Sequence, residues 1–437
     1  MDSQEENRTA EVESTEAESR GHSGHRHHSR HRRHSKNKLV KFWKKHRQVI
    51  KNIAMLVMAL ALVATLAVLA DLYSKTPTAN PEPSDEGTSE NASMMRIEVP
   101  YFGEEVPLVT GKALEYMNRD LSEPAKAFLD RINPKNERLD QGLPVKLSLN
   151  VGGVPAGCLV VSATVEVSEQ PDYSDPAVYT IRSGETGVDI PHLKTATTYY
   201  YRITYTLTDG TVSAVSSSFT TADTPRLLSI EGIVNVRDIG GWKTTNGKTI
   251  RQGLLYRGGE LDGAVEPSYR LTENGRHDML AVLGIRTDMD LRADTDNVYG
   301  TDALGANVEH IYYGAADYVY VFTQYGRDVV RQIFSDLADE THYPVYMHCT
   351  YGVDRTGTTC YLLEALLGVS EEDLQRDYEL SALYNGYLSS EHFDKFVAEL
   401  KKMEGDTLQQ KVENFLLDTG VTEAEIAKIR DIFLNGK

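Results

Sequence analysis

The chain has 437 residues, of which 40% are hydrophobic and 25% charged, as expected for a globular protein with two folded domains and extensions. Its net charge of -18 is uneven, because residues 1–52 carry a net +6 and the remainder -24. The strong negative charge of residues 53–437 argues against nucleic-acid binding. The three cysteines are odd in number and irregularly spaced, which excludes a disulfide framework and a zinc pattern: Cys158, Cys349 and Cys360.

The first segment, residues 1–48, is predicted to be a disordered cytoplasmic tail. Residues 1–20 have almost no large apolar side chains, and the basic stretch 22–38 holds six of the thirteen histidines. His-rich tracts can bind metal. No folded set of ligands follows from this one, however, and we interpret it as a solvated basic tail.

Residues 49–71 are predicted to form a transmembrane helix. The run 53–70 has no charged residue over 18 positions, which is the lower limit for a membrane-spanning helix. It is apolar on every face and lies between two segments predicted to be disordered, which argues against a helix of a soluble core. Lys and Arg precede it, which places the N-terminus in the cytoplasm and everything after residue 71 outside the cell membrane. A cleaved signal peptide is the alternative, because "VLAD" resembles a cleavage site.

Two segments separate this helix from the predicted domains. Residues 72–95 are rich in Pro, Ser, Thr and Glu and predict a disordered linker. Residues 96–139 form a juxtamembrane segment to which the sequence assigns no role. Within it, "SEPAKAFLDRI" has a Ser closely followed by Pro, which predicts a helix over about 123–132.

From residue 140 to 222 the hydrophobic pattern has a period of two. Runs such as "CLVVSATVEVS" and "TTYYYRITYTLT" alternate with turn residues and predict an all-β sandwich. The stretch "IPHLKTATTYYYRITY", followed by "SSSFTT", resembles the end of a fibronectin type III domain. That resemblance implies a spacer or binding module, with Cys158 as a small hydrophobe in a strand.

Residues 223–437 alternate predicted strands and helices. "GLLYRGG", "IRTDMDLR", "VEHIYY" and "YPVYMH" read as strands, and "ENGRHDMLAVLG" and "GRDVVRQIFSDLAD" as helices. Near the end, Thr422 and Glu425 have the spacing of a capping box. The alternation predicts an α/β domain with a mostly parallel sheet flanked by helices.

The turn "HCTYGVDRTG", residues 348–357, places a cysteine and an arginine around a glycine at a strand-to-helix junction. Backbone N–H groups and the helix dipole there would bind an oxyanion and favour a thiolate. Cys349 is therefore the candidate nucleophile, and Arg355 can grip two phosphate oxygens. Thr356 could donate to the thiolate and His348 could fix the cysteine backbone. The backbone that would bind phosphate belongs to Thr350, Tyr351, Gly352, Val353 and Asp354.

This turn resembles the phosphate loop, Cys-x5-Arg-Ser/Thr, of the protein tyrosine phosphatase superfamily. It is most similar to bacterial tyrosine phosphatases with the loop His-Cys-x-x-Gly-Lys-Asp-Arg-Thr-Gly, some of which also act on phosphoinositides. Further matching segments are "NVRDIGG", "GLLYRGGEL", "LGIRTDMDLR" and "DYELS", in the family's order. The resemblance covers about 226–435. It implies a cysteinyl-phosphate mechanism without metal or other cofactor.

The sequence departs from the family at Val353, where the family has lysine. Loss of that charge argues against multiply charged substrates, although extracellular cysteine phytases of the wider superfamily also have Gly-Val here. By the resemblance, the general acid lies in the loop "YYGAADYVY", whose carboxylate is Asp317. Asp354 is the alternative acid. Asn235, Arg237 and Asp238 are expected to buttress the phosphate loop, and Cys360 to face the core.

The sequence thus predicts a single-pass bacterial membrane protein with an extracytoplasmic phosphatase domain. Its expected substrates are phosphomonoesters, phosphotyrosine first, with dual specificity left open. One rival hypothesis is a phosphatase of inositol phosphates, phosphoinositides or other small phosphoesters. Another is a non-catalytic module that binds phosphorylated ligands or acts as an adhesin. Oligomeric state and physiological substrate do not follow from the sequence.

Overall fold

The computed structural model describes residues 96–98, 105–152, 158–292 and 303–435. The predicted tail, transmembrane helix and linker lie outside these ranges. Among the residues described, no helix combines the length and the apolar character needed to cross a bilayer. The described residues all belong to one compact unit, 91–437.

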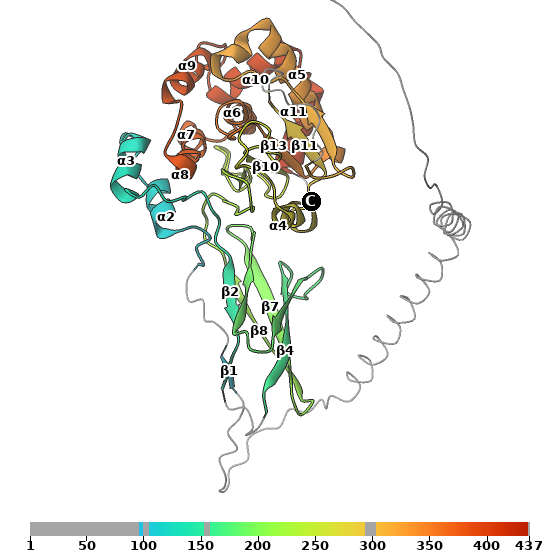
Figure 1. Ribbon diagram of the computed structural model, residues 1–437. Coiled ribbons are helices and arrows are strands. Elements are labelled where there is room, and N and C mark those ends of the chain that lie inside the picture. Colours follow the sequence, from blue (N-terminus) through green and yellow to red (C-terminus); the bar gives the residue numbers. More distant parts are fainter. Residues whose placement is uncertain (1–95, 99–104, 153–157, 293–302, 436–437) are drawn as a thin grey trace, which may run out of the picture. The chain divides into compact units, whose positions relative to one another are not determined.

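The β-rich part, here called the β module, spans residues 145–222. Strands β4 (Val160–Ser168), β5 (Ala177–Arg182), β7 (Thr198–Leu207) and β8 (Val212–Thr220) form an antiparallel sheet in the order β5-β4-β7-β8 (Figure 1). A second, two-stranded sheet pairs β2 (Val145–Ser148) with β6 (Gly187–Ile190). Buried and less buried side chains alternate strictly along β7. The two sheets share one core, as the period-two pattern predicted.

The segment before the β module divides between two cores. β1 (Arg96–Glu98) pairs with β3 (Asn150–Gly152), and the Val106 backbone donates to the Thr220 carbonyl at the end of β8 and accepts from the Ala222 N–H. Helices α2 (Gly111–Met117) and α3 (Ala125–Ile132) instead share a core with residues far along the chain, namely Leu380, Ala382 and Leu383. The predicted helix over 123–132 is confirmed, whereas α2 was not predicted.

The C-terminal part, here called the phosphatase-like domain, is built on a five-stranded sheet. Its order is β12-β11-β13-β10-β9, parallel except at β9. The bounds are β9 Arg237–Asp238, β10 Leu255–Gly258, β11 Thr287–Asp290, β12 Glu309–Tyr312 and β13 Val345–His348. The predicted α/β domain with a mostly parallel sheet is confirmed.

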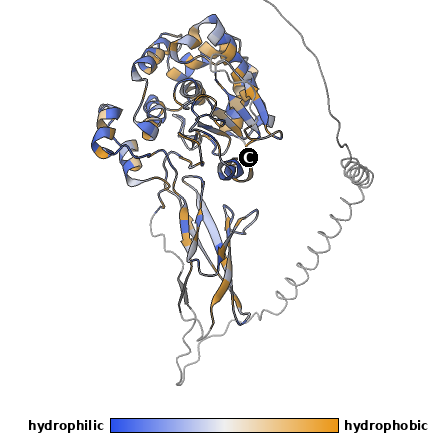
Figure 2. Ribbon diagram, viewed as in Figure 1, coloured by the Kyte–Doolittle hydropathy of each residue, from blue (hydrophilic) through white to orange (hydrophobic). Residues whose placement is uncertain are grey.

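Helices cover this sheet with apolar residues. Val345 and Met347 of β13 belong to one core cluster, and Tyr346 between them belongs to another, because successive side chains of a strand face opposite sides. Several helices carry both hydrophobic and hydrophilic stretches (Figure 2). The bounds are α4 Glu273–His277, α5 Gln324–Leu337, α6 Arg355–Leu367, α7 Glu371–Leu380, α8 Ala382–Asn385, α9 Ser390–Leu400, α10 Leu408–Thr419 and α11 Glu423–Leu434.

Local sequence signals fix several ends of these elements. The predicted capping box of Thr422 and Glu425 is present at the start of α11. The helix expected to end at Gly284 is α4 continued by a π-helical turn, Asp278–Val282, and Gly284 has a positive φ of 69°. Short 3-10 helices occupy Tyr318–Phe322 and Glu340–His342.

Candidate active site

The turn 349–354 connects the central strand β13 to the first residue of α6 (Figure 1). At Gly352 the backbone has a φ of +69°, and a Cβ atom would lie 2.4 Å from the carbonyl oxygen of Gly258. Only glycine fits such a conformation and so close an approach to the neighbouring strand. Cys349, the first residue of the turn, is buried, with 3% of its surface exposed.

Four successive carbonyl groups of this turn accept hydrogen bonds from the surrounding framework. The first two belong to Cys349 and Thr350. His348 Nδ1 lies 3.2 Å from the Cys349 carbonyl oxygen, and the Glu260 N–H donates to the Thr350 carbonyl at 3.1 Å.

The next two carbonyls are held by side chains that come from far along the chain. Asn235 Nδ2 donates to the Tyr351 carbonyl at 3.1 Å. Arg257 Nη2 donates to the Gly352 carbonyl at 3.0 Å. All four carbonyls are therefore directed outward, toward the framework.

The outward carbonyls determine where the N–H groups point. In a planar trans peptide the C=O and the following N–H point in opposite directions. The N–H groups of residues 350–353 are therefore directed away from the framework, toward the inside of the turn. Consecutive N–H groups converging on one point form an anion-binding nest, and the N-terminus of α6 adds its partial positive charge.

A buried ion-pair network holds two of these framework residues. Asp377 of α7 lies 2.7 Å from Arg257 and 3.0 Å from Arg237, and all three side chains are buried. Arg237 also donates to Asn235 Oδ1 at 2.7 Å. Burial opposes ionisation of Asp377, but the two guanidinium groups hold its pKa below the ordinary value. The network thus connects α7 to the phosphate loop through paired charges.

His348 is buried at the end of β13, with Nε2 3.0 Å from Asp288 Oδ1. Burial by itself lowers the pKa of His348, but the carboxylates of Asp288 and Asp290 raise it to about 9. The imidazole is therefore protonated at neutral pH. It can donate from Nδ1 to the Cys349 carbonyl while it is paired with Asp288.

Arg355 and Thr356 form the first turn of α6. Arg355 is half-buried, and its Nη2 lies 3.5 Å from Thr350 Oγ1. Thr356 is fully buried, and its hydroxyl has no hydrogen-bond partner within the part of the chain that the structure describes. A buried hydroxyl normally has a partner, so this one is available to donate to the Cys349 thiolate.

Asp317 precedes the 3-10 helix Tyr318–Phe322 and is half-buried. Burial, and next the Asp354 carboxylate, raise its pKa above the ordinary value, whereas Arg355 opposes the shift. The Tyr318 N–H donates to Thr358 Oγ1 of α6 at 2.9 Å, which ties this segment to the phosphate loop's helix. A carboxyl group with a raised pKa beside the loop has the properties of a general acid.

Asp354, the alternative acid, has its Oδ1 already engaged. The hydroxyls of Tyr318 and Ser389 donate to it at 2.5 and 2.9 Å. Tyr318 is also within hydrogen-bond distance of the Tyr378 hydroxyl, at 2.9 Å. These contacts join the Asp317 segment, the phosphate loop and α7, and they favour a structural role for Asp354.

Three further residues singled out in the sequence, Val353, Asp238 and Cys360, are all buried. Val353 is 2% exposed, so an apolar side chain is buried where the resembling family has lysine. Asp238 accepts hydrogen bonds from Arg226 and from the N–H groups of Gly240 and Gly253. Its partners therefore lie away from the phosphate loop, unlike those of Asn235. Cys360 is fully buried in the core, and burial raises its pKa to about 12.

Sequence reasoning missed four residues of the framework: Arg257, Glu260, Asp377 and Asp140. Asp377 opens the quoted "DYELS" segment, so its position was marked but its role was not. Arg292, at the end of the Asp-Leu-Arg segment, is buried between Asp290, Glu260 and Asp262. That ion-pair cluster leaves its guanidinium directed into the protein.

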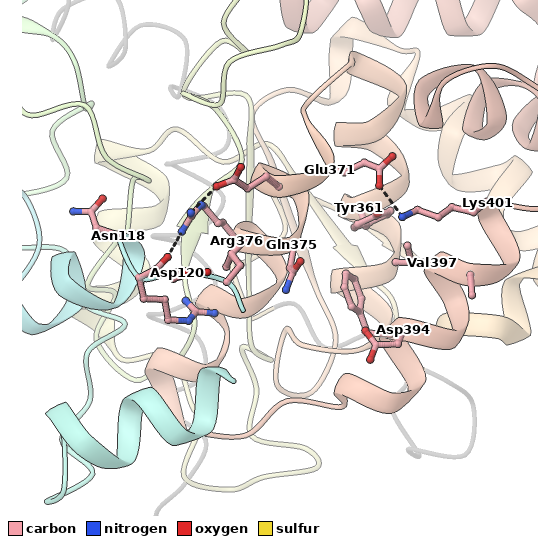
Figure 3. Close-up of a pocket in the computed structure, with 14 residues that line it drawn as sticks. Asn118, Asp120, Tyr361, Glu371, Gln375, Arg376, Asp394, Val397 and Lys401 are labelled. Atoms are coloured by element: carbon pink, nitrogen blue, oxygen red, sulfur yellow. Dashed lines mark hydrogen bonds and ion pairs between the residues drawn. The ribbon is translucent and has the colours of Figure 1, made fainter. Parts of the chain in front are cut away.

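A large open cavity of about 860 Å³ lies elsewhere (Figure 3). It is lined by the segment Asn118–Leu121, by side chains of α7 and α9, including Arg376, and by Lys401 directly after α9. None of the lining residues belongs to the turn 348–357, as the structure describes it. The candidate active site is therefore not found by cavity size. It is identified by the N–H groups of residues 350–353, which point toward the inside of the turn.

Residues 228–435 match the family described as "Tyrosine phosphatase family". A tyrosine-protein phosphatase of Nostoc commune is 29% identical, over 26% of this chain and 46% of that protein. A putative tyrosine-protein phosphatase of Cupriavidus necator is 26% identical, over 35% of this chain and 61% of that protein. The chain thus spans about half the length of these curated relatives.

Among solved structures, the core catalytic domain of the S. cerevisiae PP-IP phosphatase SIW14 has a TM-score of 0.24 and 14% identity. The match covers 37% of this chain and 80% of that domain. That likeness is too small to assign a substrate. The family match and the names of both curated relatives agree with the enzyme class predicted from the sequence, a tyrosine-phosphatase-like phosphoric monoester hydrolase.

Proposed function

We propose that the chain is a cysteine-dependent phosphatase that hydrolyses phosphotyrosine through a cysteinyl-phosphate intermediate. The observation that carries this proposal is the set of four outward carbonyls around Cys349, which turns the intervening N–H groups toward one point. Such a nest stabilises negative charge on a phosphoryl group that is being transferred.

The reaction has two steps. The Cys349 thiolate attacks phosphorus, an S–P bond forms, and the P–O bond to the leaving group breaks while Asp317 donates its proton to the leaving oxygen. Water then attacks phosphorus, Asp317 takes a proton from it, and the S–P bond breaks to release inorganic phosphate. Arg355 holds two of the equatorial oxygens throughout.

The rim of the turn favours an aryl phosphate over a polyanionic one. Tyr351 is 39% exposed, and its ring packs edge-on against Tyr269 with centroids 5.9 Å apart. Tyr269 packs in the same way against Tyr384. Burial, and next the carboxylate of Glu266, raise the pKa of Tyr351, so the nearby charge is negative. An aromatic and acidic rim suits a phosphotyrosine ring better than an inositol polyphosphate.

We also propose the location and organisation that the sequence predicts. Residues 49–71 anchor the chain in the cell membrane with the N-terminus in the cytoplasm and the phosphatase-like domain outside. The β module acts as a fibronectin type III-like spacer, a proposal that its antiparallel sheet and shared core support. Protease added to intact cells should remove the phosphatase-like domain; protection of that domain would contradict the orientation.

Hydrolysis by the full chain in detergent, with EDTA and reductant, tests the enzymatic proposal. We expect turnover of para-nitrophenyl phosphate and of a phosphotyrosyl peptide, and complete loss in Cys349→Ser. Cys158→Ser is the matched control, because Cys158 lies in the β module and should leave the rate unchanged.

A comparison of the phosphotyrosyl peptide with phytate, at equal concentration, tests the substrate class. We expect the peptide to be hydrolysed faster. Faster hydrolysis of phytate would favour the inositol-phosphate phosphatase. Inertness of a folded protein toward every substrate would favour the non-catalytic binding module.

A further inference from the structure

Residues 109–140, here called the arm, lie before the β module in the chain but pack against the phosphatase-like domain. Apolar residues of α2 and α3 share a core cluster with residues of α7 and α8. The Tyr116 hydroxyl donates to the Glu379 carbonyl at 2.8 Å, and the Leu139 N–H to the Leu383 carbonyl at 2.9 Å. Arg376 of α7 donates to the Met117 carbonyl at 2.8 Å.

The order of these parts in the chain is informative. Along the chain, β1 is followed by the arm, then by the β module, and then by the phosphatase-like domain (Figure 1). The arm lies outside the matched range 228–435. Figure 3 shows Arg376 beside Asp120, a residue of the arm. The phosphatase-like domain is therefore completed by a segment from the other side of the β module.

Asp140, at the end of the arm, is the point of contact with the site. It is 2% exposed, and its Oδ2 accepts the Asn235 N–H at 2.7 Å. Arg138 donates to both carboxylate oxygens, at 3.0 and 2.8 Å, and also to the Ile233 carbonyl at 3.2 Å. The carboxylate is thus held in one orientation by an arginine of the same arm.

Asn235 transmits this contact to the phosphate loop. Its backbone has a φ of +57°, a left-handed conformation that asparagine adopts more readily than most residues. Asp140 fixes its N–H, Arg237 fixes its side-chain oxygen, and its side-chain N–H₂ donates to the Tyr351 carbonyl. The Tyr351 carbonyl is one of the four whose orientation sets the anion-binding nest.

We propose that Asp140 is a positioning residue for the phosphate loop, and that the loop depends on the arm through Asp140 and the Arg138 side chain that holds it. The proposal rests on the proposed phosphatase function. Removing the carboxylate leaves the buried Asn235 N–H without its acceptor, which favours another backbone conformation at residue 235. The asparagine side chain then shifts from the Tyr351 carbonyl, and the peptide 351–352 is free to turn its N–H away from the bound anion.

The test uses the full chain with Asp140→Ala, Asp140→Asn and the control Tyr116→Phe. The control removes the hydrogen bond between the arm and the Glu379 carbonyl and leaves the contact of Asp140 with Asn235 in place. Three quantities are measured: kcat and KM for para-nitrophenyl phosphate, the vanadate inhibition constant, and the pH profile of Cys349 alkylation by iodoacetate. Thermal unfolding measures the stability of each variant.

We expect Asp140→Ala to lower kcat and weaken vanadate binding, each by about tenfold or more. Asp140→Asn should restore part of both, because its amide oxygen can still accept the Asn235 N–H. Tyr116→Phe should change the melting temperature only. If Asp140→Ala does not fold, Asp140→Asn is compared with the wild type instead. The expected losses of kcat and of vanadate affinity are then smaller than about tenfold.

The proposal would be overturned if both Asp140 variants had the same vanadate affinity and the same pH profile of Cys349 alkylation as Tyr116→Phe. Failure of the proposed function is distinguishable from this result. A wild-type protein without turnover can still be titrated by direct binding of vanadate and alkylated at Cys349. Those two readouts report the loop geometry independently of catalysis.

Discussion

The phosphate loop and the β module satisfy their polar groups in different ways. In the β module, Arg202 on β7 pairs with Glu166 directly opposite on β4, as neighbours in a regular ladder. In the phosphate loop, the Tyr351 carbonyl is held by Asn235, which is 116 positions away, and the Gly352 carbonyl by Arg257, which is 95 positions away. The module therefore depends on local pattern and the loop on contacts from remote parts of the chain.

This difference predicts how each region responds to substitution. A ladder has many equivalent contacts, so the loss of one is a small fraction of the total. The loop has one framework donor for each outward carbonyl, and each donor sets the direction of one N–H group. Single substitutions near the loop should therefore change the catalytic rate far more than substitutions of similar size in the module.

Gly352→Ala should give the largest effect. The added Cβ would lie 2.4 Å from a carbonyl oxygen of β10, and the φ of +69° is unfavourable for alanine. The loop must shift, and we expect kcat to fall by roughly 100-fold or more. Gly247→Ala is a matched control, because Gly247 also has a positive φ but no atom within 4 Å of its Cβ position. Equal activities of the two variants would contradict the comparison.

Asp317→Asn should give the next largest effect. Loss of a general acid typically costs about 100-fold or more in kcat, and the loss should be greatest for poor leaving groups such as tyrosine. Because burial raises the pKa of Asp317, its charged form is unfavourable in the folded protein. The amide variant should therefore unfold at the same or a higher temperature at neutral pH.

Asp354→Asn is the comparison for this variant. Its amide oxygen can still accept from Tyr318 and Ser389, so we expect a smaller loss that does not depend on the leaving group. A leaving-group dependence in Asp354→Asn alone would transfer the role of general acid from Asp317 to Asp354.

The protonated His348 predicts a pH dependence of stability. Its folded-state pKa of about 9 exceeds its ordinary value of 6.5, so its contribution is complete below pH 6.5 and is lost as the pH rises through 9. The melting temperature should fall over this interval. In His348→Gln that fall should be smaller; an unchanged fall would assign it to other groups.

Substitution in the β module should give the smallest effect. The pair of Arg202 and Glu166 is partly exposed, so Arg202→Gln should lower the free energy of unfolding by only about 0.5 kcal/mol. Chemical denaturation measures this change, and the catalytic rate should be unchanged. A loss of activity like that of Gly352→Ala would show that the two regions do not differ as described.

The contrast between local patterns in the β module and long-range contacts at the phosphate loop also explains which features could be predicted from the sequence. Period-two runs located the main strands of the module, and alternating strands and helices gave the mostly parallel sheet, because these patterns are local. The turn 348–357 was recognisable because its cysteine, glycine and arginine, Cys349, Gly352 and Arg355, lie close together in the chain. The short β6 was missed because its four residues carry too little pattern.

The framework of the site was predictable only in part. Asn235 and Arg237 lie in a recognised motif, and the structure places both in the hydrogen-bond network of the loop. Asp140 lies in a segment without any motif, and its contact with Asn235 spans 95 positions. No local periodicity encodes such a contact, since it depends on how the arm folds back past the β module.

The central claim is that Cys349 carries the phosphoryl group during turnover. The most direct measurement is acid quenching of the full chain during hydrolysis of a phosphotyrosyl peptide, followed by mass spectrometry of its proteolytic peptides. We expect a phosphoryl group on the peptide that contains Cys349, at a higher level in Asp317→Asn, where hydrolysis of the intermediate is slowed. Turnover with an unmodified Cys349, or with the phosphoryl group on another residue, would contradict it.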